Sequence, residues 1–153
     1  YKETWGILND MFANMGGTGM TLGLIIAIFI ASKRADQREV AKMSLVPGIF
    51  QINEPMIFGL PIVLNPIMAI PFVIANITMA IVTYASTYIG LVPVSIGVEV
   101  PWTTPPIIFG FLATGASIFG AITQAILIVV SIIIYTPFLI SYEKYQNKQA
   151  ANI

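Results

Sequence analysis

The stretch from Pro55 to Val98 contains no charged residue. Charged residues make up only 9% of the 153-residue chain, against about 25% in an ordinary soluble domain. Hydrophobic residues make up 57%, and the mean hydropathy is +0.87. A soluble domain of this size keeps much of its area in water and could not bury that much apolar surface. The sequence therefore predicts an integral membrane protein.

Two residue types are missing altogether, and their absence excludes several kinds of site. The chain has no cysteine, which rules out disulfides and thiolate metal sites, and no histidine, the commonest metal ligand and proton shuttle. Its net charge is zero, which gives no electrostatic basis for binding nucleic acid. We therefore expect no metal, no cofactor and no nucleic-acid partner.

Charged residues divide the chain into apolar segments of membrane-spanning length. Residues 11–32, 66–88 and 117–140 can each cross a bilayer, which needs about 20 residues in a helix. The basic segment KRADQREVAK follows the first of these, and YEKYQNKQ follows the last. Because short basic loops prefer the cytoplasm, we place both basic segments inside the cell.

Two further apolar stretches, residues 43–65 and 90–115, are rich in proline and glycine. Broken backbone at membrane depth survives only inside protein or beside a water-filled cavity, so we expect two re-entrant hairpins that enter from opposite sides. PMIFG in the first resembles PIIFG in the second, and paired broken segments point to a transporter's binding site. The predicted fold is all-α and integral to the membrane, with about three full transmembrane helices plus two hairpins in one domain, residues 1–153.

Glu54 is the one charge in the first hairpin, between Asn53 and Pro55. Proline favours the first position of a helix, which predicts Glu54 at the N-cap. The carboxylate can serve only as a cap, or it can face a polar ligand in a cavity, and the two roles are compatible. No basic residue lies in the hairpin, so a sugar or polyol fits best, with Gln51 and Asn53 supplying amides.

Trp102 stands in the second hairpin, within EVPWTTPPIIFG. A membrane tryptophan is most often an interfacial anchor, whereas one flanked by prolines and hydroxyls can stack on a sugar ring. Thr103 and Thr104 can donate to a ligand or satisfy broken backbone. We place Glu99 near the outer interface.

The glycines of NMGGTGMTLG, residues 14–23, invite comparison with a phosphate-binding loop. The sequence lacks the preceding strand and the Lys-Ser/Thr pair that such a loop requires. We expect these glycines to permit close backbone packing instead, and Asn76, in the middle of a span, to hydrogen-bond between helices.

Three segments carry a family resemblance that covers nearly the whole chain: PGIFQINEPMIFGLPIVLNPIMAIPF, VPWTTPPIIFGFLATG and IYTPFLISYEKYQ. They resemble the C-terminal, sugar-binding half of enzyme IIC, the multi-pass cytoplasmic-membrane permease of the bacterial phosphoenolpyruvate-dependent sugar phosphotransferase system. The resemblance is to the lactose/cellobiose/diacetylchitobiose type. It implies a homodimer that binds a β-linked disaccharide and passes it to the cytosolic phosphoprotein IIB for phosphorylation.

The resemblance also assigns residues. It implies that Glu54 binds the sugar and is a candidate general base toward its hydroxyl, that Trp102 lies at the sugar, and that Asn53 and Thr103 contribute. The family uses a histidine that this chain lacks, so we expect a part of a longer polypeptide, without the N-terminal scaffold half and not catalytic by itself. The alternative is a fragment of an ion- or proton-coupled secondary sugar transporter, in which Glu54 carries protons. The residues do not choose between cellobiose, diacetylchitobiose and lactose.

Overall fold

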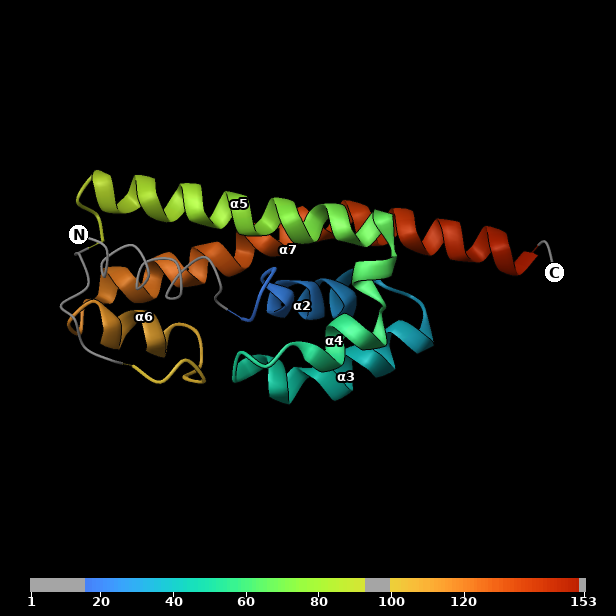
Figure 1. Ribbon diagram of the computed structural model, residues 1–153, viewed down its shortest axis with the longest axis horizontal. Coiled ribbons are helices and arrows are strands. Elements are labelled where there is room, and N and C mark those ends of the chain that lie inside the picture. The colour runs from blue at the N-terminus through green and yellow to red at the C-terminus, as the bar shows by residue number, and fades with distance from the viewer. Residues whose placement is uncertain (1–15, 93–99, 152–153) are drawn as a thin grey trace.

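The computed structural model describes residues 16–92 and 100–151, and this part of the chain is built from helices without a strand. Glu99 and the first residues of the predicted 11–32 span lie outside the described residues. In chain order the helices are α2 (Thr21–Ala31), α3 (Ala35–Ile49), α4 (Glu54–Gly59), the short 3₁₀ helix η2 (Ile62–Leu64), α5 (Pro66–Tyr88), α6 (Ile108–Ala113) and α7 (Ile118–Ala151) (Figure 1).

Two long helices, α5 and α7, run antiparallel along the length of the molecule (Figure 1). Both are long and apolar enough to cross a membrane. The predicted span 66–88 is confirmed at both ends, because Asn65 caps the helix through Ile67 N–H at 3.0 Å and Pro66 occupies its first turn. Helix α7 starts one residue after the predicted position and continues past residue 140 to Ala151, since the polar residues that follow are good helix formers.

The first predicted span is shorter than expected where the structure describes it. Helix α2 has 11 residues, which gives a rise of about 17 Å against a hydrocarbon core of roughly 30 Å. It begins only at Thr21 because Gly16, Gly17 and Gly19 adopt φ values of 78°, 83° and 80°, which a helix does not accommodate. Helix α2 alone therefore does not supply the third full span.

The two basic segments meet at one end of the molecule, next to the C-terminal part of α7. The carboxylate of Glu143 accepts hydrogen bonds from Ser32 Oγ and from the backbone N–H groups of Lys33 and Arg34. Arg34 also donates to Asn147 at 3.0 Å. This geometry agrees with the prediction that both basic segments face the same side.

The two broken segments approach each other from opposite ends (Figure 1). Helix α3 starts at the basic end, and after a turn at residues 50–53 the short helix α4 packs back against it. Residues 100–107 lead into α6, which packs against the start of α7 at the other end. Gln51 in the first turn donates its amide Nε2 to the carbonyl of Thr104 in the second at 2.5 Å. The tips therefore touch in the middle of the molecule.

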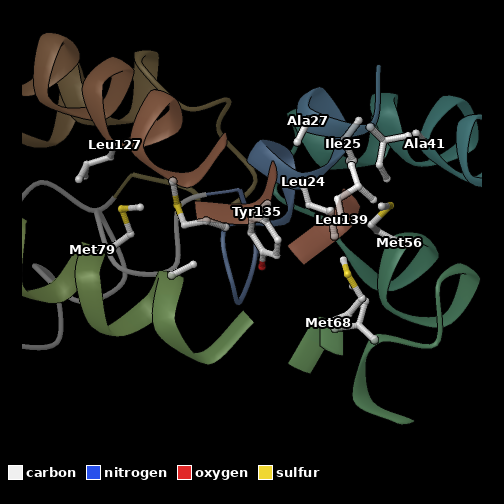
Figure 2. Packing of buried hydrophobic residues seen from close by; sticks show 14 of the residues in the cluster. Leu24, Ile25, Ala27, Ala41, Met56, Met68, Met79, Leu127, Tyr135 and Leu139 are labelled. Carbon is white, nitrogen blue, oxygen red and sulfur yellow. The ribbon is translucent and has the colours of Figure 1, made fainter. Parts of the chain in front are cut away.

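Helix α2 lies against α7 and α3, and the buried side chains between them form the core. In Figure 2, Tyr135 of α7 lies between Met79 of α5 on one side and Leu139 and Met68 on the other. The outer faces of α5 and α7 carry apolar side chains that are half or more exposed, spaced three or four residues apart: Ile70, Val73, Ile77 and Ile81, and Ile126, Val129 and Ile133. Apolar stripes of this kind suit a surrounding of lipid or of other membrane helices.

Candidate functional site

The tip of the first hairpin is a tight turn that presents the start of α4. The carbonyl of Pro47 accepts from the backbone N–H groups of both Phe50 and Ile52. Gln51 between them takes the left-handed conformation, with φ 66°. For a residue other than glycine this conformation costs roughly 1–2 kcal/mol, so the turn stores strain.

Helix α4 begins one residue earlier than predicted, at Glu54 instead of Pro55. The N-cap is Asn53, whose carbonyl accepts from Met56 and Ile57 N–H at 3.0 Å, and Glu54 is the first helical residue. The prediction of Glu54 as the N-cap is therefore wrong by one position, because the helical hydrogen bonding already starts at Asn53. No side chain caps this helix.

Glu54 itself is exposed on the described chain. Among the described residues its carboxylate has no hydrogen-bond or ion-pair partner, and the two ion pairs there, Arg34–Asp36 and Lys42–Glu39, lie elsewhere. An acidic group at the start of a helix is favoured by the helix dipole without needing a side-chain partner. Its acceptor oxygens remain available to a ligand.

Asn53 is buried, and it joins the tip to the glycine-rich segment, which we define as residues 16–20. Its Nδ2 donates to the carbonyl of Thr18 at 2.7 Å. A Cβ on Gly17 would lie 2.5 Å from the Asn53 side chain, so only glycine allows this approach. The prediction of close backbone packing at these glycines is confirmed.

The glycine-rich segment is held from two other helices. Asn76 of α5 accepts from Gly19 N–H at 2.9 Å, and the Tyr135 hydroxyl of α7 donates to the Gly19 carbonyl. We expected Asn76 to hydrogen-bond to another helix, and this is wrong. Its partner is the backbone of a loop, whose N–H and C=O groups need hydrogen bonds that are not made within a helix. Tyr135 was not singled out from the sequence, although a tyrosine in an apolar span signals a hydroxyl that needs a buried partner.

The second tip is a turn from Pro101 to Thr104, closed by the hydrogen bond from Thr104 N–H to Pro101 O at 2.9 Å. Trp102 projects from it and is 67% exposed, and Thr103 is half-buried. The Thr104 carbonyl receives the amide of Gln51. That amide therefore connects the two tips, and its second N–H and its carbonyl oxygen are left for another partner.

The start of α6, just beyond this turn, is closed by α7. The buried side-chain oxygen of Gln124 accepts from Ile107 N–H at 2.6 Å and from Gly110 N–H at 2.8 Å. Ile107 has φ 76°, so the backbone bends sharply here. Gln124 is a second residue that sequence reasoning missed, and a glutamine in an apolar span was the available signal.

The first tip carries the carboxylate of Glu54, and the second carries the exposed ring of Trp102. The hydrogen bond from Gln51 to Thr104 joins the two tips. Carboxylate oxygens accept strong hydrogen bonds from hydroxyl groups, and an aromatic face packs against apolar C–H surface. Within residues 16–92 and 100–151, no three acidic side chains gather in a way that could hold a metal ion. The site chemistry therefore fits a neutral, hydroxylated ligand.

Comparison with known proteins shows which family this chain resembles. The family described as "Phosphotransferase system, EIIC" matches residues 4–76. The lichenan permease IIC component of Bacillus subtilis (strain 168) is 42% identical over 140 residues, which is 92% of this chain and 31% of the relative. The oligo-beta-mannoside-specific EIIC component of the same strain is 48% identical over 130 residues, 85% of this chain and 29% of the relative.

A solved structure is similar in fold over nearly the whole chain. The crystal structure of the transporter ChbC, the IIC component of the N,N'-diacetylchitobiose-specific phosphotransferase system, has a TM-score of 0.88 and 36% identity, covering 93% of this chain and 33% of that one. The chain thus spans about a third of the length of the proteins it matches. With its helices, paired hairpins and sequence all in agreement, the chain belongs to the EIIC family of the phosphotransferase system.

Proposed function

We propose that this chain is the C-terminal, sugar-binding part of a phosphotransferase-system permease that takes up a β-linked disaccharide of the cellobiose, diacetylchitobiose or lactose type. Relatives with these specificities in their names support the sugar class, since an EIIC component specific for cellobiose in Lactococcus lactis is 42% identical over 140 residues. A lactose-specific EIICB component of Staphylococcus epidermidis is 35% identical over 147 residues. Membership of this family favours group translocation over ion-coupled transport.

The single observation that carries the proposal is the carboxylate of Glu54, which has no partner among the described residues and stands at a hairpin tip that is tied to the tip bearing Trp102. Glu54 accepts sugar hydroxyls, and Trp102 stacks on one sugar ring. Asn53 contributes its side-chain oxygen and its second amide N–H, since one N–H donates to Thr18. Gln51 likewise keeps its oxygen and one N–H beside the bond to Thr104, and Thr103 adds a hydroxyl.

Phosphorylation follows at the cytosolic side, where the IIB partner carries the phosphoryl group on a cysteine. Glu54 acts as general base and takes the proton from the sugar 6-hydroxyl while the hydroxyl oxygen attacks phosphorus and the sulfur–phosphorus bond breaks. The chemistry belongs to the complex with IIB, and this chain binds and orients the sugar. In the intact permease it works in the bacterial cytoplasmic membrane as part of a homodimer.

The Glu54→Gln variant of the intact permease tests the proposal. We expect cellobiose affinity to fall at least about tenfold, because an amide accepts hydroxyl hydrogen bonds more weakly than a carboxylate does. Phosphorylation by phospho-IIB should fall by a further factor of about 100, the low end of what a general base contributes. The melting temperature should change little, since the Glu54 carboxylate has no partner among the described residues and only its small interaction with the helix dipole is lost.

Glu39→Gln is the matched control, because Glu39 is also exposed, lies on α3 and, within the described residues, pairs with Lys42 alone. It should leave affinity and phosphorylation unchanged. Undiminished cellobiose binding and phosphorylation in Glu54→Gln would refute the assignment of the site.

A further inference from the structure

Three side chains, one each from the first hairpin tip, α5 and α7, form hydrogen bonds with two neighbouring residues of the glycine-rich segment. The carbonyl of Thr18 accepts from Asn53, the N–H of Gly19 donates to Asn76, and the carbonyl of Gly19 accepts from Tyr135. These contacts bridge 35, 57 and 116 positions along the chain. The segment is therefore the point where the first hairpin tip, α5 and α7 are joined.

The segment has no room to move independently of its neighbours. A Cβ added to Gly19 would collide with the ring of Phe72 on α5, and one added to Gly17 would collide with the side chain of Asn53. Backbone that is in van der Waals contact on both sides transmits a displacement rather than absorbing it. A shift of Gly19 therefore reaches Asn53, which is adjacent to Glu54.

The two side chains that hold Gly19 are polar groups in otherwise apolar spans. Tyr135 is fully buried, and its hydroxyl would be unsatisfied there without the Gly19 carbonyl. Its neighbours one turn away on the same face of α7, Ser131 and Leu139, are buried as well. An apolar residue at position 135 would pack into this core without requiring a partner, so packing alone does not explain the hydroxyl.

We propose that Asn76 and Tyr135 are positioning residues, which fix the backbone of Gly19 and, through Thr18 and Asn53, the hairpin tip that carries Glu54. The consequence for sugar binding rests on the proposed function, whereas the fixing of the tip does not. Neither residue needs to touch the sugar. Their effect on affinity passes through Glu54.

Tyr135→Phe and Asn76→Leu in the intact permease each remove one of the two contacts to Gly19. Hydrogen–deuterium exchange without sugar should become at least about threefold faster for residues 50–57 in both variants. Cellobiose affinity, measured by calorimetry, should fall five- to tenfold. Asn76→Asp keeps a carbonyl or carboxylate acceptor for Gly19 N–H, and it should retain more affinity than Asn76→Leu.

Tyr142→Phe is the matched control, because Tyr142 is a buried tyrosine on the same helix whose hydroxyl accepts from Gln146 at the basic end. It should change neither the exchange of residues 50–57 nor the affinity. A double variant supplies the readout that a purely structural role would not give. In the Glu54→Gln background, Tyr135→Phe should cause less than a twofold further loss of affinity.

The proposal is overturned if residues 50–57 exchange at the wild-type rate in both Gly19-contact variants, or if Tyr142→Phe accelerates them equally. Full additivity of Tyr135→Phe with Glu54→Gln also contradicts it. Either contact variant that accumulates in folded form is sufficient for the test. A wild-type permease that binds no cellobiose or other β-linked disaccharide would refute the proposed function, and the exchange experiment would still decide the role of Asn76 and Tyr135.

Discussion

The two hairpins have similar ingredients and close their short helices differently. Helices α4 and α6 each have six residues, and each follows a turn with a non-glycine residue at positive φ, Gln51 at 66° and Ile107 at 76°. In the second hairpin the first backbone N–H groups are taken by Gln124 of α7. In the first hairpin no side chain of the described residues caps α4, and the exposed Glu54 stands at its start.

We interpret this difference as one between a helix break whose backbone is satisfied within the chain and a helix break that leaves a group exposed for a ligand. Backbone interrupted at membrane depth needs partners, and Gln124 supplies them from within the chain. The first hairpin is instead fixed at its flanks, by Asn53 to Thr18 and by Gln51 to Thr104, while its acidic start stays free of partners in the described residues. The start of the second short helix is therefore closed from within the chain, whereas the first leaves exposed the carboxylate that we propose binds the ligand.

The strongest test of this contrast is Gln124→Leu. It leaves the buried N–H group of Gly110 and the part-buried N–H group of Ile107 without their acceptor, at roughly 1–3 kcal/mol each, so we expect a loss of about 2–4 kcal/mol in the free energy of unfolding. The melting temperature of the purified permease measures it. Glu54→Gln, at the start of α4, should cause no such loss.

Thr123→Val serves as the control for Gln124→Leu. Its hydroxyl donates to Phe119 O at 2.8 Å within its own helix, so its removal should change stability by less than about 0.5 kcal/mol. Equal melting temperatures for Gln124→Leu and wild type would show that the start of α6 does not depend on Gln124, and so does not differ from the start of α4 in this respect.

The joint between the tips gives a smaller effect. Gln51→Ala loses the hydrogen bond to Thr104 and keeps a side chain in the left-handed conformation, so we expect a loss of about 1 kcal/mol. Gln51→Gly loses the same bond but adopts φ 66° freely, so the relief of strain offsets the loss to within about 0.5 kcal/mol. Chemical denaturation of both variants in detergent measures the difference, and equal stability of the two would contradict strain at this tip.

The sequence predicts the long elements well because few signals compete there. Pro66 after Asn65 marks the start of α5, and the span ends at residue 88 as predicted. The prediction for 117–140 concerned the membrane-crossing stretch, and α7 continues beyond it because the polar residues after 140 contain no glycine or proline to stop a helix. The shortness of α2 depends on positive φ angles at three glycines, and a glycine in the sequence permits such angles without requiring them.

At the candidate site, too, the sequence indicates which residue types stand out but not which residues they contact. Glu54 and Trp102 stand out in the sequence because a carboxylate or a proline-flanked tryptophan is conspicuous in an apolar hairpin, although their role in binding stays a prediction. The hydrogen bonds that place the tip join residues up to 116 positions apart, and periodicity carries no information on such pairs. The roles of Asn76 and Tyr135 therefore emerge only from the structure.

The smallest effect concerns charge, which distinguishes the two hairpins again. Helix α3, which leads into the first hairpin, starts with the Arg34–Asp36 ion pair, whereas the segment from residue 100 to 142 has no charged side chain. The hydrogen bond from Arg34 lowers the pKa of the Asp36 carboxyl below its usual value. A lowered pKa in the folded state means that the pair stabilises the protein above the unfolded pKa of about 3.9, and that this stability is lost as the pH falls through the lower folded value.

Because 56% of the Asp36 side chain is exposed, solvent screening limits the contribution to less than about 0.5 kcal/mol. Wild type should therefore lose slightly more stability than Asp36→Asn between pH 5 and pH 3, as measured by the melting temperature in detergent. Exchange at pH 3, corrected for intrinsic rates, should accelerate at the start of α3 and not in α6. An identical acid response in wild type and Asp36→Asn would show that the ion pair does not stabilise the entry of the first hairpin, and that charge is not part of the difference between the two.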